Sequence, residues 1–296
     1  MNKCYYYKII NNNKGIFNNI VDAVGILTME NSNREHQYMN QINKHNIHSN
    51  IHIQYNKGYI NCNKELKKQN TLNDICDSYY TLFKYFINNN YDKVLILEDD
   101  FLLDDNINNY INDIEDFTNN NKFDAINLGA GMFILNPLYI NDKFKQCFMF
   151  MTTHGIIYNR SYLLKYINMY ENGEITNDYD KYFIFPKKLY IYEKPLVYQP
   201  IVKTTNSSNW EIMGIKTQNI LFLIYKLLNM KYDNYENIKK AWIKTYKLYY
   251  LINILLISLI IKFIINNIFN VSIQILKFNE ILLMVLPIYE KIIKIE

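Results

Sequence analysis

The chain has 296 residues, 49% hydrophobic and 20% charged, which is enough for one large α/β domain and an additional segment. Its net charge is +4, from 32 basic and 28 acidic residues, and the basic residues are scattered in short runs. This distribution excludes the extended basic surface of a nucleic-acid-binding protein, so we expect no nucleic-acid partner.

The first residues combine Tyr, Lys and Asn without a continuous apolar core. We therefore expect no signal peptide and a protein that faces the cytosol. The four cysteines have no close paired spacing, which predicts reduced thiols and neither a disulfide framework nor a zinc site.

Strand and helix patterns alternate from residue 21 onward. The apolar run 21–29 is typical of a buried strand, and residues 51–55 alternate at period two like a second strand. Between them, residues 33–44 are expected to form a helix. Apolar side chains then recur at helical spacing over residues 75–86, which predicts an amphipathic helix. Its expected cap is Thr71 or Asn73.

Residues 94–97 are wholly apolar, as a central parallel strand should be. A helical face follows at 107–114, and residues 123–128 return as a strand. Strands and helices that alternate at this spacing predict βαβ units and a mostly parallel, twisted sheet.

A strand at 155–158 leads to a helix capped near Ser161, and short strands are expected at 189–192 and 196–198. From residue 217 the chain changes to long apolar helical segments, so the domain boundary is placed within 210–216. We therefore expect a catalytic domain at 1–216 and a helical region at 217–296.

Glu98, Asp99 and Asp100 follow the apolar strand without a gap. A buried carboxylate is costly unless it is paired or binds a metal ion. Glu98 and Asp100 project to one side of an extended chain, and Asp99 projects to the other. Two oxygen ligands on one side can hold Mg²⁺ or Mn²⁺ together with diphosphate oxygens. The alternative is an acidic turn that caps the next helix.

The segment 94–100, Val-Leu-Ile-Leu-Glu-Asp-Asp, resembles the strand and acidic motif of GT-A glycosyltransferases. In particular it is similar to glycosyltransferase family 25, the lipopolysaccharide and collagen galactosyltransferase type, which large DNA viruses also encode. The resemblance extends over about residues 21–210. It departs from the family at Asn63-Lys64-Glu65, where the family carries Ser-His. The further matching segments, in the family's order, are 23–28 with Arg34, Gly58 with Cys62, 123–129, 154–158, Asp180 to Phe183, and 195–199.

This resemblance implies a GT-A fold, which is α/β and Rossmann-like, with helices flanking the sheet. It implies a hexosyltransferase of glycan biosynthesis that moves a sugar from a nucleotide-sugar donor, a UDP-sugar, to a hydroxyl of a glycan or protein acceptor with inversion. Asp100 is then the direct ligand of Mn²⁺ or Mg²⁺, and Glu98 contacts the metal through water or contacts the donor ribose. Thr28, Arg34 and Asp99 fall on the donor side, where Arg34 is a candidate phosphate contact. The alternative for Arg34 is an exposed residue at the start of a helix.

Inverting transfer also needs a base that deprotonates the acceptor hydroxyl. Asp180 is the first candidate and Asp178 the second, with a solvated acidic turn as the alternative. His154 is a candidate third metal ligand or diphosphate contact, and its alternative is a structural role. Gln199 is placed on the acceptor side.

Residues 248–265 are apolar except for three positions, and the lysines before them favour a cytosolic catalytic domain. Two interpretations remain: a helix associated with a membrane, or a helix packed onto the domain. An apolar stretch at 271–288 is interrupted by charges and is expected to be interfacial or packed. The alternative function is a catalytically inactive, membrane-associated scaffold that kept the GT-A fold.

Overall fold

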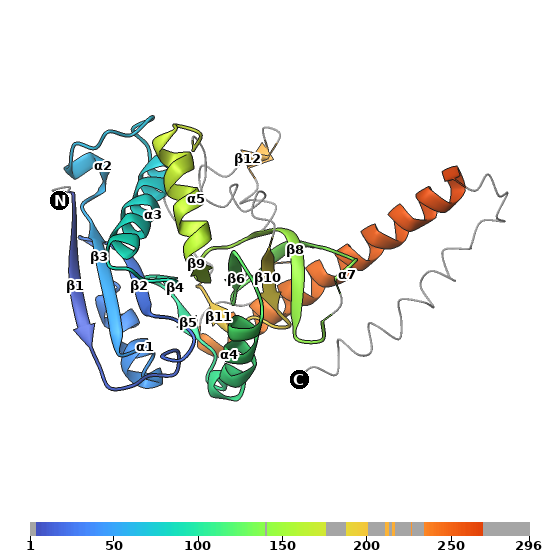
Figure 1. Ribbon diagram of the computed structural model, residues 1–296, viewed down its shortest axis with the longest axis horizontal. Helices are drawn as coiled ribbons and strands as arrows, with labels where there is room; N and C mark the ends of the chain where they lie inside the picture. The colour runs from blue at the N-terminus through green and yellow to red at the C-terminus, as the bar shows by residue number, and fades with distance from the viewer. Residues whose placement is uncertain are drawn as a thin grey trace.

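The structure is a computed structural model that describes residues 4–139, 141–175, 188–200, 211–212, 215–216, 226 and 234–268. Within these residues a nine-stranded sheet lies between two layers of helices, and a long C-terminal helix projects from one side (Figure 1). The α/β class expected from the sequence is confirmed.

The large sheet is formed by β1 (Tyr5–Asn11), β2 (Ala23–Met29), β3 (Asn50–Asn56), β4 (Lys93–Glu98), β6 (Ala125–Asn127), β7 (Met132–Leu135), β8 (Phe144–Met151), β9 (Gly155–Asn159) and β10 (Leu189–Tyr192). Two small sheets pair β5 (Leu102–Leu103) with β11 (Val197–Tyr198), and β12 (Glu211–Ile212) with β13 (Ile215–Lys216). The helices are α1 (Glu35–His45), α2 (Gly58–Asn61), α3 (Thr71–Asn88), the 3₁₀ turn η1 (Ile107–Asn109), α4 (Ile111–Asn120), α5 (Arg160–Glu171) and α7 (Tyr235–Ile268).

The strand order of the large sheet is β1-β3-β2-β4-β9-β6-β10-β8-β7. Three neighbouring pairs are parallel, β3–β2, β2–β4 and β6–β10, and the other five are antiparallel. The expectation of a mostly parallel sheet is therefore wrong. Apolar runs reveal burial but not strand direction, and β9 inserts between β4 and β6 antiparallel to both.

Strand β4 shows why the sheet needs helices on both faces. Leu95 and Leu97 belong to one apolar cluster, which includes residues of α1 and α4. Val94 and Ile96 belong to a second cluster, which includes residues of α3 and α5. Because successive side chains point to opposite faces, a wholly apolar strand is buried on both.

The predicted helix over 75–86 is confirmed as α3, but the residues predicted to cap it are wrong. The Asn70 side chain accepts a hydrogen bond from the backbone N–H of Asn73, so Asn70 is the N-cap and Thr71 opens the helix. Helix α5 is capped in the same way by Asn159, whose side chain accepts from the N–H of Ser161.

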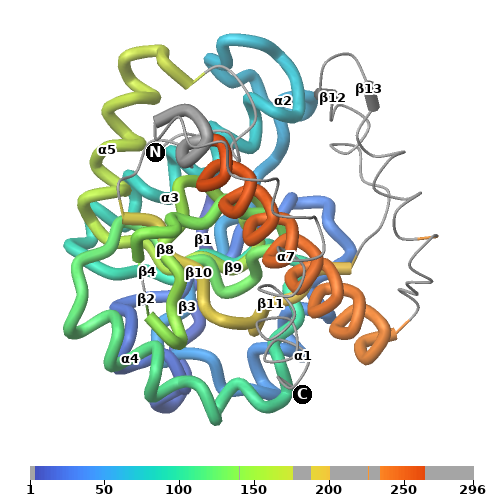
Figure 2. Tube along the Cα trace, turned by 90° about the vertical axis from the view of Figure 1, so that its right-hand side faces the viewer, coloured from blue at the N-terminus to red at the C-terminus, as the bar shows by residue number. Residues whose placement is uncertain are grey.

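Helix α7 packs onto the domain from its first turn to Asn253. Ile238, Ala241, Trp242 and Tyr246 are buried, and Asn253 bonds to both the N–H of Leu135 and a neighbouring carbonyl on β7. Helix α7 contacts β7, and Figure 2 shows α7 running diagonally across the domain. The predicted boundary at residue 216 stays a prediction.

Beyond Asn253 the helix presents large apolar side chains to the outside, among them Leu259 at 58% and Phe263 at 68% exposure. The segment Tyr235–Phe263 has 29 residues and contains an 18-residue window with a mean hydropathy of 1.6, so by length and composition it is able to cross a membrane. The apolar stretch expected at 271–288 lies outside the described residues.

Cys4 and Cys62 form a disulfide, so the expectation of four reduced thiols is wrong for this pair. Strand β1 pairs with β3 in a register that sets Tyr5 opposite Asn56, which brings Cys4 to the segment after β3. Cys76 and Cys147 are buried thiols outside this disulfide.

Candidate functional site

The acidic motif lies where β4 ends. Glu98 is the last residue of the strand, and the N–H of Phe101 closes a turn by donating to the Glu98 carbonyl at 3.0 Å. Asp99 and Asp100 lie in this turn and are buried, at 8% and 3% exposure. Apolar β4 therefore presents carboxylates at its carboxyl end, the usual position of ligand crevices in α/β sheets.

Asp99 faces the segment that joins β2 to α1. Its Oδ2 accepts hydrogen bonds from the hydroxyls of Thr28 and Ser32, both at 2.8 Å. Its Oδ1 accepts from Nη1 of Arg34 at 2.8 Å. Asp99 thus contacts both Thr28 and Arg34, the other two residues that the resemblance assigned to the donor side.

Asp100 is held between a guanidinium and an amide. Arg34 Nη1 donates to Asp100 Oδ2 at 2.9 Å, and Gln199 Nε2 donates to Asp100 Oδ1 at 2.9 Å. Burial and the negative charge of Glu98 raise the pKa of Asp100 to about 7, although Arg34 opposes both. The ionised form of Asp100 is therefore short of positive charge.

Glu98 turns away from Asp99 and toward α3, β9 and β11. Its Oε1 accepts hydrogen bonds from the hydroxyls of Tyr79, at 3.2 Å, and Thr153, at 2.8 Å. Its Oε2 accepts from Gln199 Nε2 at 3.2 Å. One amide nitrogen therefore contacts an oxygen of both Glu98 and Asp100.

The shared contact with Gln199 Nε2 indicates whether Glu98 and Asp100 suit a divalent cation. Glu98 and Asp100 converge on the positive end of the Gln199 amide, and both are hard oxygen donors. Across the described ranges, no three His, Cys, Asp or Glu side chains converge on one point. The donor set fits Mg²⁺ or Mn²⁺ held by one or two carboxylates and completed by substrate phosphates, and it does not fit an all-protein cage.

His154 is fully buried beside this site. Its Nε2 lies 3.1 Å from the carbonyl oxygen of Val197, and its Nδ1 has no hydrogen-bond partner in the described part of the chain. Its ring lies 4.7 Å from that of Trp242. Burial lowers the pKa of His154 to about 4, so the ring is neutral at pH 7. Neither nitrogen bonds to a carboxylate, and its role as a ligand stays a prediction.

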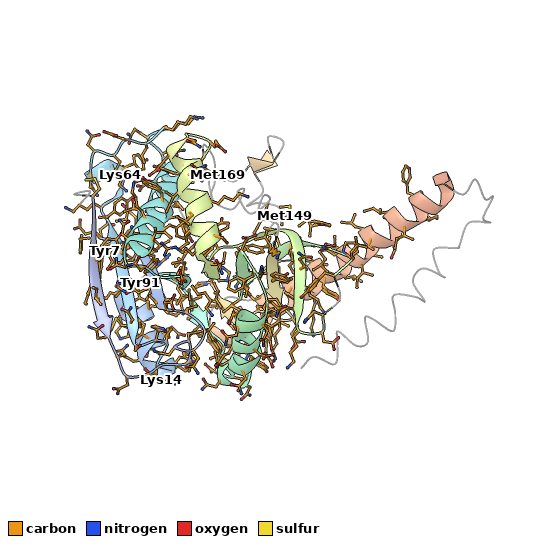
Figure 3. The ribbon with its side chains drawn as sticks, viewed as in Figure 1. Tyr7, Lys14, Lys64, Tyr91, Met149 and Met169 are labelled. Carbon is orange, nitrogen blue, oxygen red and sulfur yellow. A yellow bond between two sulfur atoms is a disulfide. The ribbon has the colours of Figure 1, made fainter. Side chains whose placement is uncertain are left out.

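Lys64, at the departure from the family pattern, is buried between α2 and α3 (Figure 3). Its ammonium group forms a close ion pair with Asp74 and donates to the Tyr5 hydroxyl at 2.6 Å. The Tyr5 hydroxyl in turn donates to Asp77 at 2.5 Å. These mutual contacts give Lys64 a structural role within a buried ionic cluster.

Asp178 and Asp180, the predicted bases, lie outside the described residues. The structure brings together Thr28, Arg34 and the three acidic residues of the motif, as the sequence indicated. Sequence reasoning missed the hydroxyl donors Ser32, Tyr79 and Thr153, because single polar residues in unrelated segments carry no pattern.

No protein-family model matches this chain, and comparison with curated proteins gives no match.

Proposed function

We propose that this protein is a metal-dependent glycosyltransferase that uses a nucleotide-sugar donor, with the cation held by Glu98 and Asp100. The observation that carries the proposal is the convergence of these two carboxylates, at the end of a buried strand, on the single amide nitrogen of Gln199. Two carboxylates that share one neutral N–H donor leave negative charge that a divalent cation would neutralise.

The residues around the motif divide the remaining work. Arg34 is partly exposed, with 34% of its side chain accessible, and it orients the carboxylates of Asp99 and Asp100. Tyr79 and Thr153 fix the orientation of Glu98. A bound Mn²⁺ or Mg²⁺ would neutralise the departing nucleoside diphosphate. The proposed base, Asp180 or Asp178, would take the proton from the acceptor hydroxyl, with a glycan or protein as acceptor.

The second half of α7 supports association with a membrane. The buried first half cannot enter a bilayer while it is docked, so the helical segment available is 252–268, in which exposed apolar side chains run from Ile252 to Phe263. Seventeen helical residues extend about 25 Å, close to the roughly 30 Å of a hydrocarbon core. We propose that this segment holds the catalytic domain at a cytosol-facing membrane.

The test of the proposed function is a screen for hydrolysis of UDP- and GDP-sugars with Mn²⁺, because hydrolysis needs no acceptor. Asp100→Asn should reduce Mn²⁺-dependent hydrolysis by more than the roughly 10- to 100-fold loss typical of outer-shell partners. Asp77→Asn is the matched control, since it removes a buried carboxylate of the Lys64 cluster and should leave the metal dependence unchanged. Hydrolysis at the wild-type rate in Asp100→Asn would show that the metal assignment is wrong.

One observation favours a second function, the inactive scaffold. Arg34 and Gln199 already occupy oxygens of Asp100, and Asp99 accepts bonds from Thr28, Ser32 and Arg34. A motif whose charges are compensated by side chains can persist without a metal ion. The scaffold predicts no Mn²⁺ binding and no donor hydrolysis in the full-length protein.

A further inference from the structure

Gln199, the residue that bridges Glu98 and Asp100, is itself held by α7. It follows β11, and its backbone carbonyl accepts a hydrogen bond from Nε1 of Trp242 at 2.7 Å. Trp242 is only 6% exposed. A residue of the C-terminal helix therefore fixes the main chain from which the bridging amide extends.

The same face of α7 holds both strands of the small sheet beside the acidic motif. Tyr235, Lys239 and Trp242 stand at i, i+4 and i+7, so they share one side of the helix. The Tyr235 hydroxyl donates to the carbonyl of Leu103 on β5 at 3.1 Å and accepts from the N–H of Asp105 at 2.9 Å.

Lys239 reaches the same region through a buried carboxylate. Its ammonium group lies 3.0 Å from Asp104, which also accepts a hydrogen bond from the hydroxyl of Tyr198 on β11 at 2.5 Å. β5 begins two residues after Asp100, and β11 ends just before Gln199. Helix α7 thus contacts both the segment that follows Asp100 and the segment that precedes Gln199.

Trp242 has little freedom to move. Its ring lies against the buried His154, and a Cβ at Gly131 would come within 2.4 Å of the indole. Gly131 therefore allows a close approach that any side chain would prevent. The indole N–H is held in place to fix the Gln199 carbonyl, because the ring is confined on both sides.

We propose that the first turns of α7 are part of the cation site, and that Trp242 is a positioning residue that acts through Gln199. The inference rests on the proposed function, since it names residues that set the affinity of the same site. It makes the C-terminal helix a component of the catalytic unit as well as its anchor. Helix α7 is then connected to Glu98 and Asp100 through Trp242 and Gln199, which are hydrogen-bonded to each other.

The test is the dissociation constant of Mn²⁺ for full-length protein in detergent, measured by electron paramagnetic resonance of the free ion. Trp242→Phe keeps an aromatic ring and removes the N–H donor, and it should weaken Mn²⁺ binding about 10-fold. Tyr235→Phe removes the hydroxyl that holds β5 at a partly exposed position, and it should shift the affinity in the same direction. Tyr246→Phe is the control, because it removes a buried hydroxyl bond to the Tyr192 carbonyl further along α7.

Tyr246→Phe should leave Mn²⁺ affinity unchanged even where it lowers the melting temperature. If Trp242→Phe fails to fold, the Mn²⁺ affinity of Tyr235→Phe alone tests the proposal. Wild-type affinity in both folded variants, beside a wild-type protein that binds Mn²⁺, would overturn the positioning role and leave the proposed function standing. A wild-type protein that binds no Mn²⁺ would overturn both.

Discussion

Removal of the Cys4–Cys62 disulfide should destabilise the protein by an amount set by the loop that it closes. The two cysteines are 58 residues apart in the chain. In the chain-entropy description, closing a loop of this length removes about 4 kcal/mol of conformational freedom from the unfolded state at 25 °C. We therefore expect Cys62→Ser to lower the free energy of unfolding by about 4 kcal/mol relative to oxidised wild type.

The assay is equilibrium unfolding in urea of oxidised and reduced wild type and of Cys62→Ser. Reduced wild type and Cys62→Ser should coincide, and oxidised wild type should unfold at higher urea. Cys76→Ser is the control, since Cys76 is buried and unbridged, and its oxidised and reduced forms should still differ by the wild-type amount. Four reactive thiols in the denatured, non-reduced protein, or equal stability with and without reductant, would refute the reasoning.

Two further predictions concern pH and chain length. Burial lowers the pKa of His52 to about 4, and the nearby His48 adds to this effect. As pH falls below about 6.5, the unfolded state takes up the proton first, so up to about 3 kcal/mol of the stability present above that pH is lost toward pH 4. His52→Gln should make the free energy of unfolding depend less on pH over this range, and an unchanged pH dependence would contradict the assignment. A chain truncated after Ile254 should be soluble and bind Mn²⁺, whereas a chain truncated after Lys216 should aggregate because it exposes the face that α7 covers. Gel filtration distinguishes the two results, and a monomeric chain ending at Lys216 would refute this expectation.

Apolar periodicity was sufficient to predict the elements that build the centre of the fold. β4 has four consecutive buried residues, and α3 carries a continuous apolar face, so each has a pattern that few other structures explain. These two elements also fix where the acidic motif lies, because Glu98 ends β4 and Tyr79 of α3 contacts it. The position of the site followed from local sequence.

Strand β1 and the disulfide could not be predicted in this way. β1 is an edge strand with several exposed residues, and its sequence, rich in Tyr, Lys and Asn, resembles the loops of this chain. Its antiparallel pairing with β3 is the contact that brings Cys4 near Cys62. Because the cysteines are separated by three strands and two helices, their spacing carries no signal of the bridge.

The contacts of the acidic motif were likewise only partly predictable. Arg34 was named through the family resemblance, and the structure places it on Asp99 and Asp100. Gln199 was assigned to the acceptor side, and the structure places it between Glu98 and Asp100. Trp242 lies more than 140 residues from the motif in the sequence, just before the apolar run 248–265 that suggested an anchor. Tertiary packing alone makes it part of the site.

The same contacts explain how one motif permits both candidate functions. Without a cation, Arg34 and the Gln199 amide compensate part of the buried charge of Asp100. A divalent cation bound by Glu98 and Asp100 would add the attraction of a full double charge to the weaker attraction of the neutral amide. The gain depends on how firmly Gln199 keeps the two carboxylates in place, and Trp242 fixes the Gln199 main chain. The distinction between an enzyme and a scaffold therefore lies in the rigidity of the segment that α7 holds, as much as in the identity of the carboxylates.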